Sequence, residues 1–426
     1  MFRRGLAGVT TMTLLSYGGE YMAFTSVLTW LYNLTTARGV DPLQAYGFGF
    51  LVSAVYLLVS GVLAVPFGSL SDRFGRRPLA VVGCVSAGLS ILDLPATALL
   101  TEANFVILAV SLVLIFVGIG HGTFTASALA YAGDISSSSN VGQAYGLVET
   151  AEYAMFMFGT PLGFIVAQLY GNIWTFVITG GILLTAALAA VVGMPERRRN
   201  ADSTASSSQS AEVGKTDASL AVGGNSGPQG QIKLLFKAVQ DSGVLIALIA
   251  IFFVSMGFTA FRIYMTQYGT SGQAVPVVGP YLISIMAIAS TLAAVPIGKL
   301  VDLSKKRMPV LIVGFVIEAI ALVAILVNPT ALTLIAWSVA FGVAIMLVRI
   351  PQAVIVAERT QVENRAGAMG ANHAVEHIGY GAGAFLGGLF VVSFGLSSLT
   401  SFAVFGAMSL VAGLVFLPLW KKLGLN

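Results

Sequence analysis

Acidic and imidazole side chains cluster at two places within long apolar stretches of the chain. Glu149 and Glu152 are three residues apart, and His373, Glu376 and His377 are spaced by three and four. In a helix, these spacings put each group on one face. Buried acids can bind and release protons near neutral pH, and imidazole titrates there without any perturbation. We therefore predict that these five residues form a proton relay; the alternative is a clamp between helices that moves no proton.

Four further ionisable residues, Glu20, His121, Arg262 and Arg349, stand singly in other apolar stretches. A charge at the centre of a bilayer costs at least about 2.5–3.5 kcal/mol, so such residues are rare unless they face a polar path. We expect a water-accessible path between the helices, although pairing that only fixes helix positions would also account for them. Glu318 lies in a similar stretch, and the sequence suggests no role for it.

A short polar motif occurs twice between apolar stretches. Gly68-Ser-Leu-Ser-Asp72 is followed by the basic residues Arg73, Arg76 and Arg77, and Gly298-Lys-Leu-Val-Asp302 is followed by Lys305, Lys306 and Arg307. The repetition indicates a duplicated helical bundle, an architecture that is typical of proteins that move solutes.

The composition requires a membrane. The chain is 57% hydrophobic and 9% charged, whereas a soluble domain carries about 25% charged residues. The apolar runs are longer than the roughly ten residues of a barrel strand and fit helices of about 20 residues. The single cysteine excludes an internal disulfide, and the scattered His residues form no zinc-type spacing. We expect no metal and no cofactor, and the net charge of +4 is not a nucleic-acid signal.

Charged and Pro-, Gly- or Asn-rich breaks divide the chain into twelve apolar spans. We therefore predict an all-α integral membrane protein of twelve transmembrane helices in two six-helix pseudo-symmetric bundles. The bundles are expected over 1–194 and 242–426, joined by a Ser- and Gly-rich flexible linker over 195–241. The expected spans are 6–31, 43–69, 79–99, 105–133, 142–169, 173–194, 242–268, 277–298, 309–327, 330–357, 367–394 and 398–419.

The placement of basic residues predicts the orientation. Of the 22 Lys and Arg residues, all but Arg38, Arg262 and Arg349 fall on one side of this span map. Loops rich in Lys and Arg stay in the cytoplasm. We therefore expect a multi-pass protein of the cell membrane whose termini and linker are cytoplasmic.

The two halves align without gaps when Gly146 is placed on Gly370. Glu152 then falls on Glu376, and Asp134 falls on Glu358. The same offset pairs further glycines, so the halves are parallel repeats.

With these motifs, the chain resembles the major facilitator superfamily over essentially its whole length. The stretch from Gly68 to Arg77 is similar to the signature loop of that family between helices 2 and 3, and the second copy departs from it at Leu303 and Lys305. The resemblance implies that helices 1, 4, 7 and 10 line a central cavity and that helices 2, 5, 8 and 11 form the seam between the halves. It thereby assigns substrate binding to Glu20, His121, Arg262 and Arg349.

The resemblance also implies a cytoplasmic gate. Asp72 would lie near a helix N-terminus of the other half, whose dipole favours an anion. Arg76 or Arg77 would reach Asp134, and Lys306 would reach Glu358. The predicted gate residues are Gly68, Asp72, Arg73, Gly75, Arg76, Arg77, Asp134, Asp302 and Glu358.

These observations predict a secondary active transporter that works by alternating access, is coupled to protons and moves a small polar or anionic organic solute. A drug or cation efflux antiporter of the same fold, a passive facilitator and a non-transporting membrane sensor remain as alternatives. An enzyme is not expected, because the chain has no phosphate-binding loop of the Gly-x4-Gly-Lys-Ser/Thr type and no nucleophile–base set. Its expected partners are the solute, protons and lipid, and it is expected to be a monomer.

Overall fold

Within the residues that the structure describes, the chain forms twelve long α-helices. The computed structural model describes residues 2–135, 141–195, 240–270, 279–304, 307–327, 330–360, 365–395 and 398–423. The helices of the first half are α1 (Phe2–Thr36), α2 (Pro42–Phe74), α3 (Arg76–Asp93), α4 (Ala103–Ile135), α5 (Val141–Tyr170) and α6 (Asn172–Gly193). Those of the second half are α8 (Ser242–Thr270), α9 (Gly279–Ser304), α10 (Arg307–Val327), α11 (Ala331–Arg359), α12 (Arg365–Phe394) and α13 (Ser398–Leu423).

Local signals set the ends of α2. The Asp41 side chain accepts hydrogen bonds from the backbone N–H groups of Leu43 and Gln44, and Pro42 is the first helical residue, a position that tolerates proline. At the other end, Gly75 has a φ of 98° and separates α2 from α3. This left-handed conformation favours glycine, and Arg76 and Arg77 follow it as the first two residues of α3.

The third expected span is not one continuous α-helix. The α-helix ends at Asp93, and a 3-10 helix, η1 (Leu94–Leu99), continues the chain. Pro95 lies in the first turn of η1, where its missing N–H removes the hydrogen bond that would extend α3.

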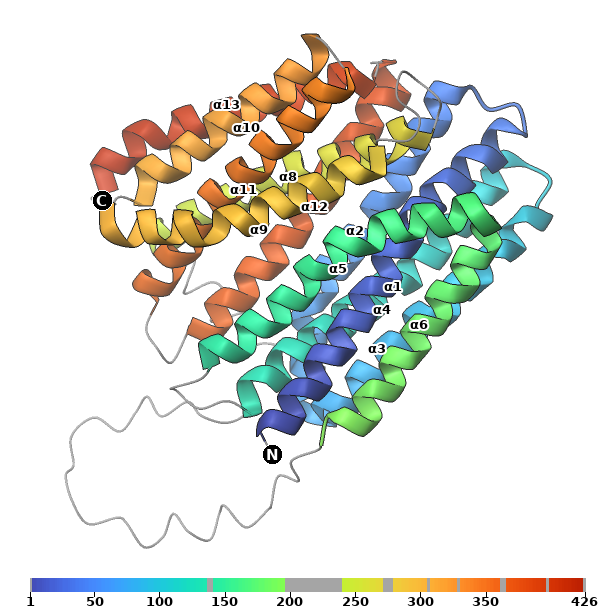
Figure 1. Ribbon diagram of the computed structural model, residues 1–426, viewed down its shortest axis with the longest axis horizontal. Helices are drawn as coiled ribbons and strands as arrows, with labels where there is room; N and C mark the ends of the chain where they lie inside the picture. Colours follow the sequence, from blue (N-terminus) through green and yellow to red (C-terminus); the bar gives the residue numbers. More distant parts are fainter. Residues whose placement is uncertain are drawn as a thin grey trace, which may run out of the picture.

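The helices form two bundles, α1–α6 and α8–α13 (Figure 1). Across the seam between them, α2 packs along α12 and α5 packs along α9. The internal repeat is visible in the packing within each bundle. Gly159 of α5 packs against Tyr21 of α1, and its repeat partner Gly383 of α12 packs against Met256 of α8. Corresponding helix pairs therefore meet at corresponding glycines, which allow close approach.

The contacts between the bundles include close pairs near the end of the molecule that contains the connection from α1 to α2. Gly387, near the end of α12, packs against Phe50, near the start of α2. On the other seam, Phe164 of α5 meets Tyr281 at the start of α9, with ring centroids 6.2 Å apart. Figure 1 shows the two bundles spreading apart towards the end that carries both chain termini.

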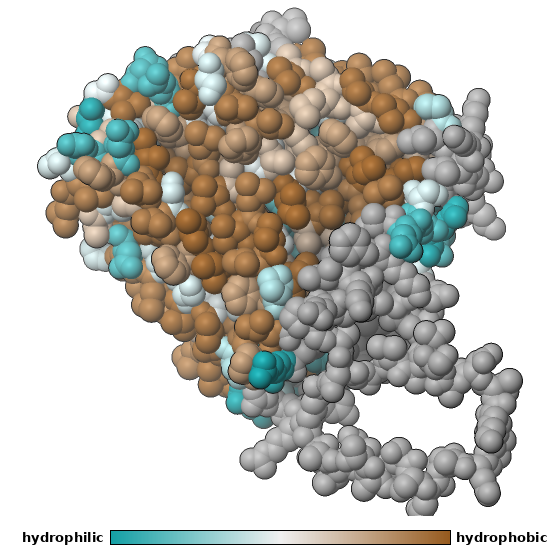
Figure 2. Space-filling model, turned by 180° about the vertical axis from the view of Figure 1, so that it is seen from behind, coloured by the Kyte–Doolittle hydropathy of each residue, from teal (hydrophilic) through white to brown (hydrophobic). Residues whose placement is uncertain are grey.

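The outer surface is apolar. Ten of the helices are long and apolar enough to cross a membrane within the described residues. Of the other two, α1 carries Glu20 and several hydroxyl side chains, and α13 has a shorter apolar run, Phe402–Pro418. Figure 2 shows apolar side chains over most of one face, with polar residues towards its edges. An exposed apolar surface of this kind needs lipid, and the protein is a multi-pass membrane protein.

Candidate functional site

A buried acid and an imidazole pair in the N-terminal bundle. Glu20 of α1 and His121 of α4 approach to 2.5 Å between Oε2 and Nδ1, and both side chains are 4% exposed. The Tyr56 hydroxyl of α2 lies 3.1 Å from each of these two atoms. Side chains of α1, α2 and α4 therefore meet at one buried carboxylate oxygen.

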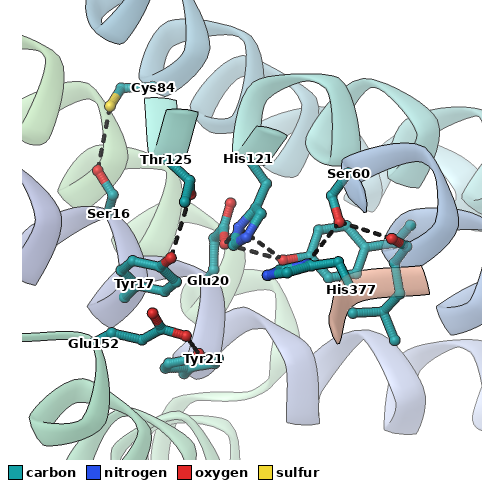
Figure 3. A network of polar contacts seen from close by, with 12 residues as sticks. Ser16, Tyr17, Glu20, Tyr21, Ser60, Cys84, His121, Thr125, Glu152 and His377 are labelled. Carbon is teal, nitrogen blue, oxygen red and sulfur yellow. Dashed lines mark hydrogen bonds and ion pairs between the residues drawn. The ribbon is translucent and has the colours of Figure 1, made fainter. Parts of the chain in front are cut away.

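The seam brings a second imidazole to this pair. The ring of His377, on α12, lies 5.1 Å from that of His121, and its Nδ1 is 3.2 Å from the Ser60 hydroxyl of α2 (Figure 3). Gly61 makes this approach possible, because a Cβ at that position would lie 2.8 Å from the Cβ of His377. The seam between α2 and α12 is therefore also the place where titratable groups of the two bundles meet.

The C-terminal bundle continues the cluster. His373 and His377 have ring centroids 4.5 Å apart, and His373 Nδ1 lies 3.9 Å from Glu376 Oε2. The other oxygen of Glu376 accepts a hydrogen bond from the Tyr380 hydroxyl at 2.5 Å and forms an ion pair with Arg349 of α11 at 2.6 Å. The Glu376 side chain is 6% exposed, so its charge is balanced inside the protein rather than by water.

Arg262 of α8 projects among aromatic rings of the N-terminal bundle. Its guanidinium carbon lies 3.8 Å from the ring centroid of Phe24, 5.1 Å from that of Tyr21 and 5.4 Å from that of Phe156. The Tyr21 hydroxyl also donates to Glu152 Oε1 at 3.3 Å. Cation–π contacts of this kind contribute about 0.5–2 kcal/mol each and fix the orientation of the guanidinium plane.

A cavity between the bundles joins these groups. The space not filled by protein atoms within it and at its open mouth is about 440 Å³. Its wall contains both arginines, two histidines, one acid and an aromatic surround, namely Tyr21, Tyr56, Leu57, His121, Glu152, Tyr153, Phe156, Phe258, Arg262, Arg349, His377 and Tyr380. A largely apolar wall with a few converging polar groups is typical of a small-molecule site.

The structure places the predicted substrate residues and relay residues in one cluster. His121, assigned to the substrate, meets His377 of the relay, and Arg349 binds Glu376. The side chain of Glu149 lies outside the described residues. Among the described residues, no group of three or more His, Cys, Asp or Glu side chains is arranged to hold a metal ion.

The sequence interpretation missed three hydroxyl residues that connect this cluster. Tyr56 and Ser60 of α2 and Tyr380 of α12 each bond to an acid or a histidine. Tyr380 follows Glu376 by four residues, so the helical spacing could have placed it on the same face. Single Tyr and Ser residues such as Tyr56 and Ser60 give no comparable signal.

Ion pairs stand at the predicted gate in both halves. Arg76 Nε lies 2.9 Å from Asp134 Oδ2, and Arg307 Nη2 lies 2.8 Å from Glu358 Oε1. The sequence interpretation expected Lys306 beside Glu358, but Lys306 lies outside the described residues, and Arg307 occupies that place. Arg307 is the first residue of α10, as Arg76 is of α3.

Of the other predicted gate residues, Gly68 and Arg73 make only local contacts. The Gly68 carbonyl accepts a hydrogen bond from Arg76 Nη1 at 3.3 Å. Arg73 is exposed and lies over the ring of Phe74. The side chains of Asp72 and Asp302 lie outside the described residues.

A family model for the Major Facilitator Superfamily matches residues 9–289 and 266–423. The chain belongs to the major facilitator superfamily. This finding confirms the resemblance drawn from the signature loop and the internal repeat, and it agrees with the two-bundle fold. The family and the relatives are transporters and not enzymes.

Two relatives match part of this superfamily member. The MFS-type transporter MJ1560 of Methanocaldococcus jannaschii is 26% identical over 181 residues, which make up 39% of this chain and 45% of the relative. The inner membrane transport protein YajR of Escherichia coli is 29% identical over 189 residues, 43% of this chain and 38% of that protein. The match thus spans less than half the length of either relative.

Solved structures match the fold over nearly the whole chain. A POT family transporter in complex with 5-aminolevulinic acid has a TM-score of 0.72 at 12% identity, covering 99% of this chain and 96% of the other. A point mutant of the nucleoside transporter NupG has a TM-score of 0.68 at 13% identity, covering 97% and 99%. At these identities the likeness shows the shared fold alone.

Proposed function

We propose that this protein is a proton-coupled secondary transporter that moves a small polar or anionic organic solute across the cell membrane. The two bundles, residues 1–194 and 242–426, alternate access to a site between them. The termini and the segment 195–241 lie in the cytoplasm, where the Lys- and Arg-rich loops favour them. The protein works as a monomer.

One observation carries the proton coupling: titratable side chains follow one another from Glu20 in the first bundle to Glu376 in the second. The steps are the Glu20–His121 contact, the neighbouring rings of His121 and His377, and the contact of His373 with Glu376. Imidazole can accept a proton on one nitrogen and release it from the other. Because this series crosses the seam, a relative movement of the bundles would interrupt it, which is what couples a proton to a conformational change.

The nature of the solute follows from the cavity wall. Arg262 and Arg349 are charged at any physiological pH, and a guanidinium offers several N–H donors in one plane. Both residues line the cavity between the bundles, so a carboxylate or another cluster of acceptors there would meet two cationic donors. The aromatic wall suits an organic body rather than a bare inorganic ion.

Reconstituted protein tests the coupling. In proteoliposomes that contain a trapped pH-sensitive dye, addition of a transported carboxylate should change the internal pH, and an imposed pH gradient should drive solute accumulation. Glu376→Gln should abolish the response to the gradient. Glu102→Gln, the same substitution at an exposed residue before α4, should keep it.

The alternatives predict different results. Accumulation that ignores the pH gradient would favour a passive facilitator. Uptake of organic cations in place of carboxylates would favour a drug or cation efflux antiporter. Solute binding without any flux would favour a membrane sensor.

A further inference from the structure

Glu318 is a buried acid that takes no part in the proposed series of titratable groups. It lies in the middle of α10 with an exposed fraction of 0%, and neither carboxyl oxygen has a hydrogen bond of standard geometry within the described residues. An acid in an apolar interior must either be paired with a positive charge or carry a proton. The neighbours of Glu318 therefore decide its chemical state.

Three helices enclose this carboxyl group, and two of them approach α10 at glycines. A Cβ at Gly257 of α8 would collide with Oε1 of Glu318, and a Cβ at Gly406 of α13 would lie 3.1 Å from the carbonyl oxygen of Ala319. The side chain of Leu322, one turn further along α10, lies close to both glycines. Packing this close leaves no room for bulk water beside the acid.

The two helices that carry these glycines place no charge beside Glu318. Arg262 of α8 lies among the aromatic rings of the N-terminal bundle, and Tyr264 packs on Phe402 of α13 with 4.3 Å between the ring centroids. The described side chains of α13 include no titratable group. What α13 contributes is the hydroxyl of Ser409, which is buried and is the polar neighbour of the carboxyl group.

The basic residues on the other helices around α10 are paired or exposed. Arg349 of α11 and Arg307 of α10 each form an ion pair with a different acid. Lys299 of α9 and Arg359 of α11 are exposed. Glu318 thus forms no ion pair within the described residues, and an ionised carboxylate there would be an uncompensated charge in an apolar interior, which is highly unfavourable.

We propose that Glu318 is a second proton-binding site of this protein, separate from the series that crosses the seam. In this conformation it is a neutral carboxylic acid whose proton lies between the carboxyl group and the Ser409 hydroxyl. The proton leaves when α8 moves away from α10 and admits water. A proton fits this junction better than a metal cation, because hard cations take about six or more oxygen ligands, whereas a carboxyl group and one hydroxyl can hold a single proton.

The site links proton binding to the position of α8. A carboxyl group in water is ionised at neutral pH, so the dry junction and the bound proton stabilise each other. Arg262, on the same helix, lines the cavity between the bundles, and a movement of α8 therefore reaches both places. This inference extends the proposed function, because a second proton would accompany that movement, but the site itself can be tested without transport.

Infrared spectroscopy of the purified full-length protein tests the chemical state of Glu318. A protonated carboxyl group has a carbonyl stretch above the amide band, and an ionised one does not. At neutral pH, Glu318→Gln should remove such a band. The matched control is Glu358→Gln, at a carboxylate side chain that is 55% exposed, which should remove none. In the unmodified protein the band should disappear reversibly as the pH is raised.

A second variant identifies the band while the acid stays in place. Ser409→Ala removes the hydroxyl beside the carboxyl group, and a carboxyl group without a hydrogen-bond partner has a higher stretching frequency, so the band should shift upward. The control Ser290→Ala removes a buried hydroxyl of α9 that bonds to the carbonyl groups of Met286 and Gly342, and it should leave the band in place. This measurement decides if Glu318→Gln does not fold.

Hydrogen–deuterium exchange tests the link to α8. At an alkaline pH at which the band is lost, backbone amides of α8 around Gly257 should exchange at least about tenfold faster in the unmodified protein than in Glu318→Gln, because an uncompensated buried charge favours local opening. At neutral pH the two proteins should exchange at equal rates. Comparing both proteins at the same pH removes the intrinsic effect of pH on exchange.

Several results would overturn the inference. Absence of the band at every pH would show an ionised Glu318, and a band that persists until the protein unfolds would show a permanently neutral acid. Loss of the band on addition of sodium ions at constant pH would show a metal-cation site, and equal α8 exchange at alkaline pH would separate the proton from helix movement. Each of these leaves the proposed function standing. If the band behaves as expected but no solute crosses the membrane, the proposed function fails and the proton site stands.

Discussion

The ion pair between Arg349 and Glu376 allows a quantitative test of how the cluster is held together. The Arg349 side chain is 20% exposed and that of Glu376 is 6% exposed, with 2.6 Å between Nη2 and Oε1. Glu376→Gln keeps the shape of the side chain but removes its charge. Removing one partner from a buried ion pair costs about 3–5 kcal/mol. Arg349 keeps some contact with water and lies over the ring of Tyr153, so we expect the lower end, about 3 kcal/mol.

The assay is thermal unfolding of purified protein in one detergent. For a bundle of this size, 1 kcal/mol shifts Tm by about 2–4 °C, so Glu376→Gln should lower Tm by about 6–12 °C. The matched control is Glu358→Gln, the same substitution in an ion pair with Arg307 at 2.8 Å whose carboxylate side chain is 55% exposed. Exposed pairs contribute about 0–1 kcal/mol, so the control should shift Tm by no more than about 4 °C.

A double variant separates the pair from its surroundings. Arg349→Gln combined with Glu376→Gln removes both charges, so its loss of stability should be smaller than the sum of the two single losses. Equal Tm shifts for Glu376→Gln and Glu358→Gln, or strictly additive effects in the double variant, would refute the electrostatic reasoning.

Two other predictions rest on single contacts, and a third rests on the signature loop. Tyr56→Phe removes the hydroxyl that contacts both Glu20 and His121. It should lower the free energy of unfolding by about 1–3 kcal/mol and slow proton-coupled uptake. Unchanged Tm and uptake would contradict this role. Gly257→Ala would place a methyl group against the Glu318 carboxyl group and should lower the free energy of unfolding by about 1–3 kcal/mol through overpacking. The control is Gly181→Ala, which has open space around it and should be neutral or stabilising. Equal effects of the two substitutions would count against the packing argument. Asp72→Asn should leave the protein folded but slow uptake strongly if Asp72 acts in the gate, and uptake in proteoliposomes at the normal rate would exclude that role.

The helical architecture could be predicted because local sequence determines it. In lipid each helix must satisfy its own backbone, so long apolar stretches separated by charged loops define the twelve helices. The end of α3 at Asp93 was missed, although Pro95 is a local signal for it. The two polar loops indicated the duplication, and the packing of Gly159 and Gly383 on α1 and α8 follows the same repeat.

The partners of the site residues could not be predicted in this way. The helical spacing placed His373, Glu376 and His377 on one face, but it contains no information about which residues of another helix that face meets. The approach of His377 to His121 depends on the contact between α2 and α12 at Gly61, which is a property of tertiary packing. The separate assignment of substrate and relay residues followed from assigning each helix one role, whereas neighbouring helices share their side chains at the centre of the molecule.

Glu20 is the residue at which the predicted substrate and relay roles meet. Its Oε2 takes part in the series of titratable groups through His121, and its side chain lines the same opening between the helices as Arg262. In the proposed mechanism, a solute bound against that wall and a proton carried by the series act on one carboxylate, and linkage makes the effect of either on the other reciprocal.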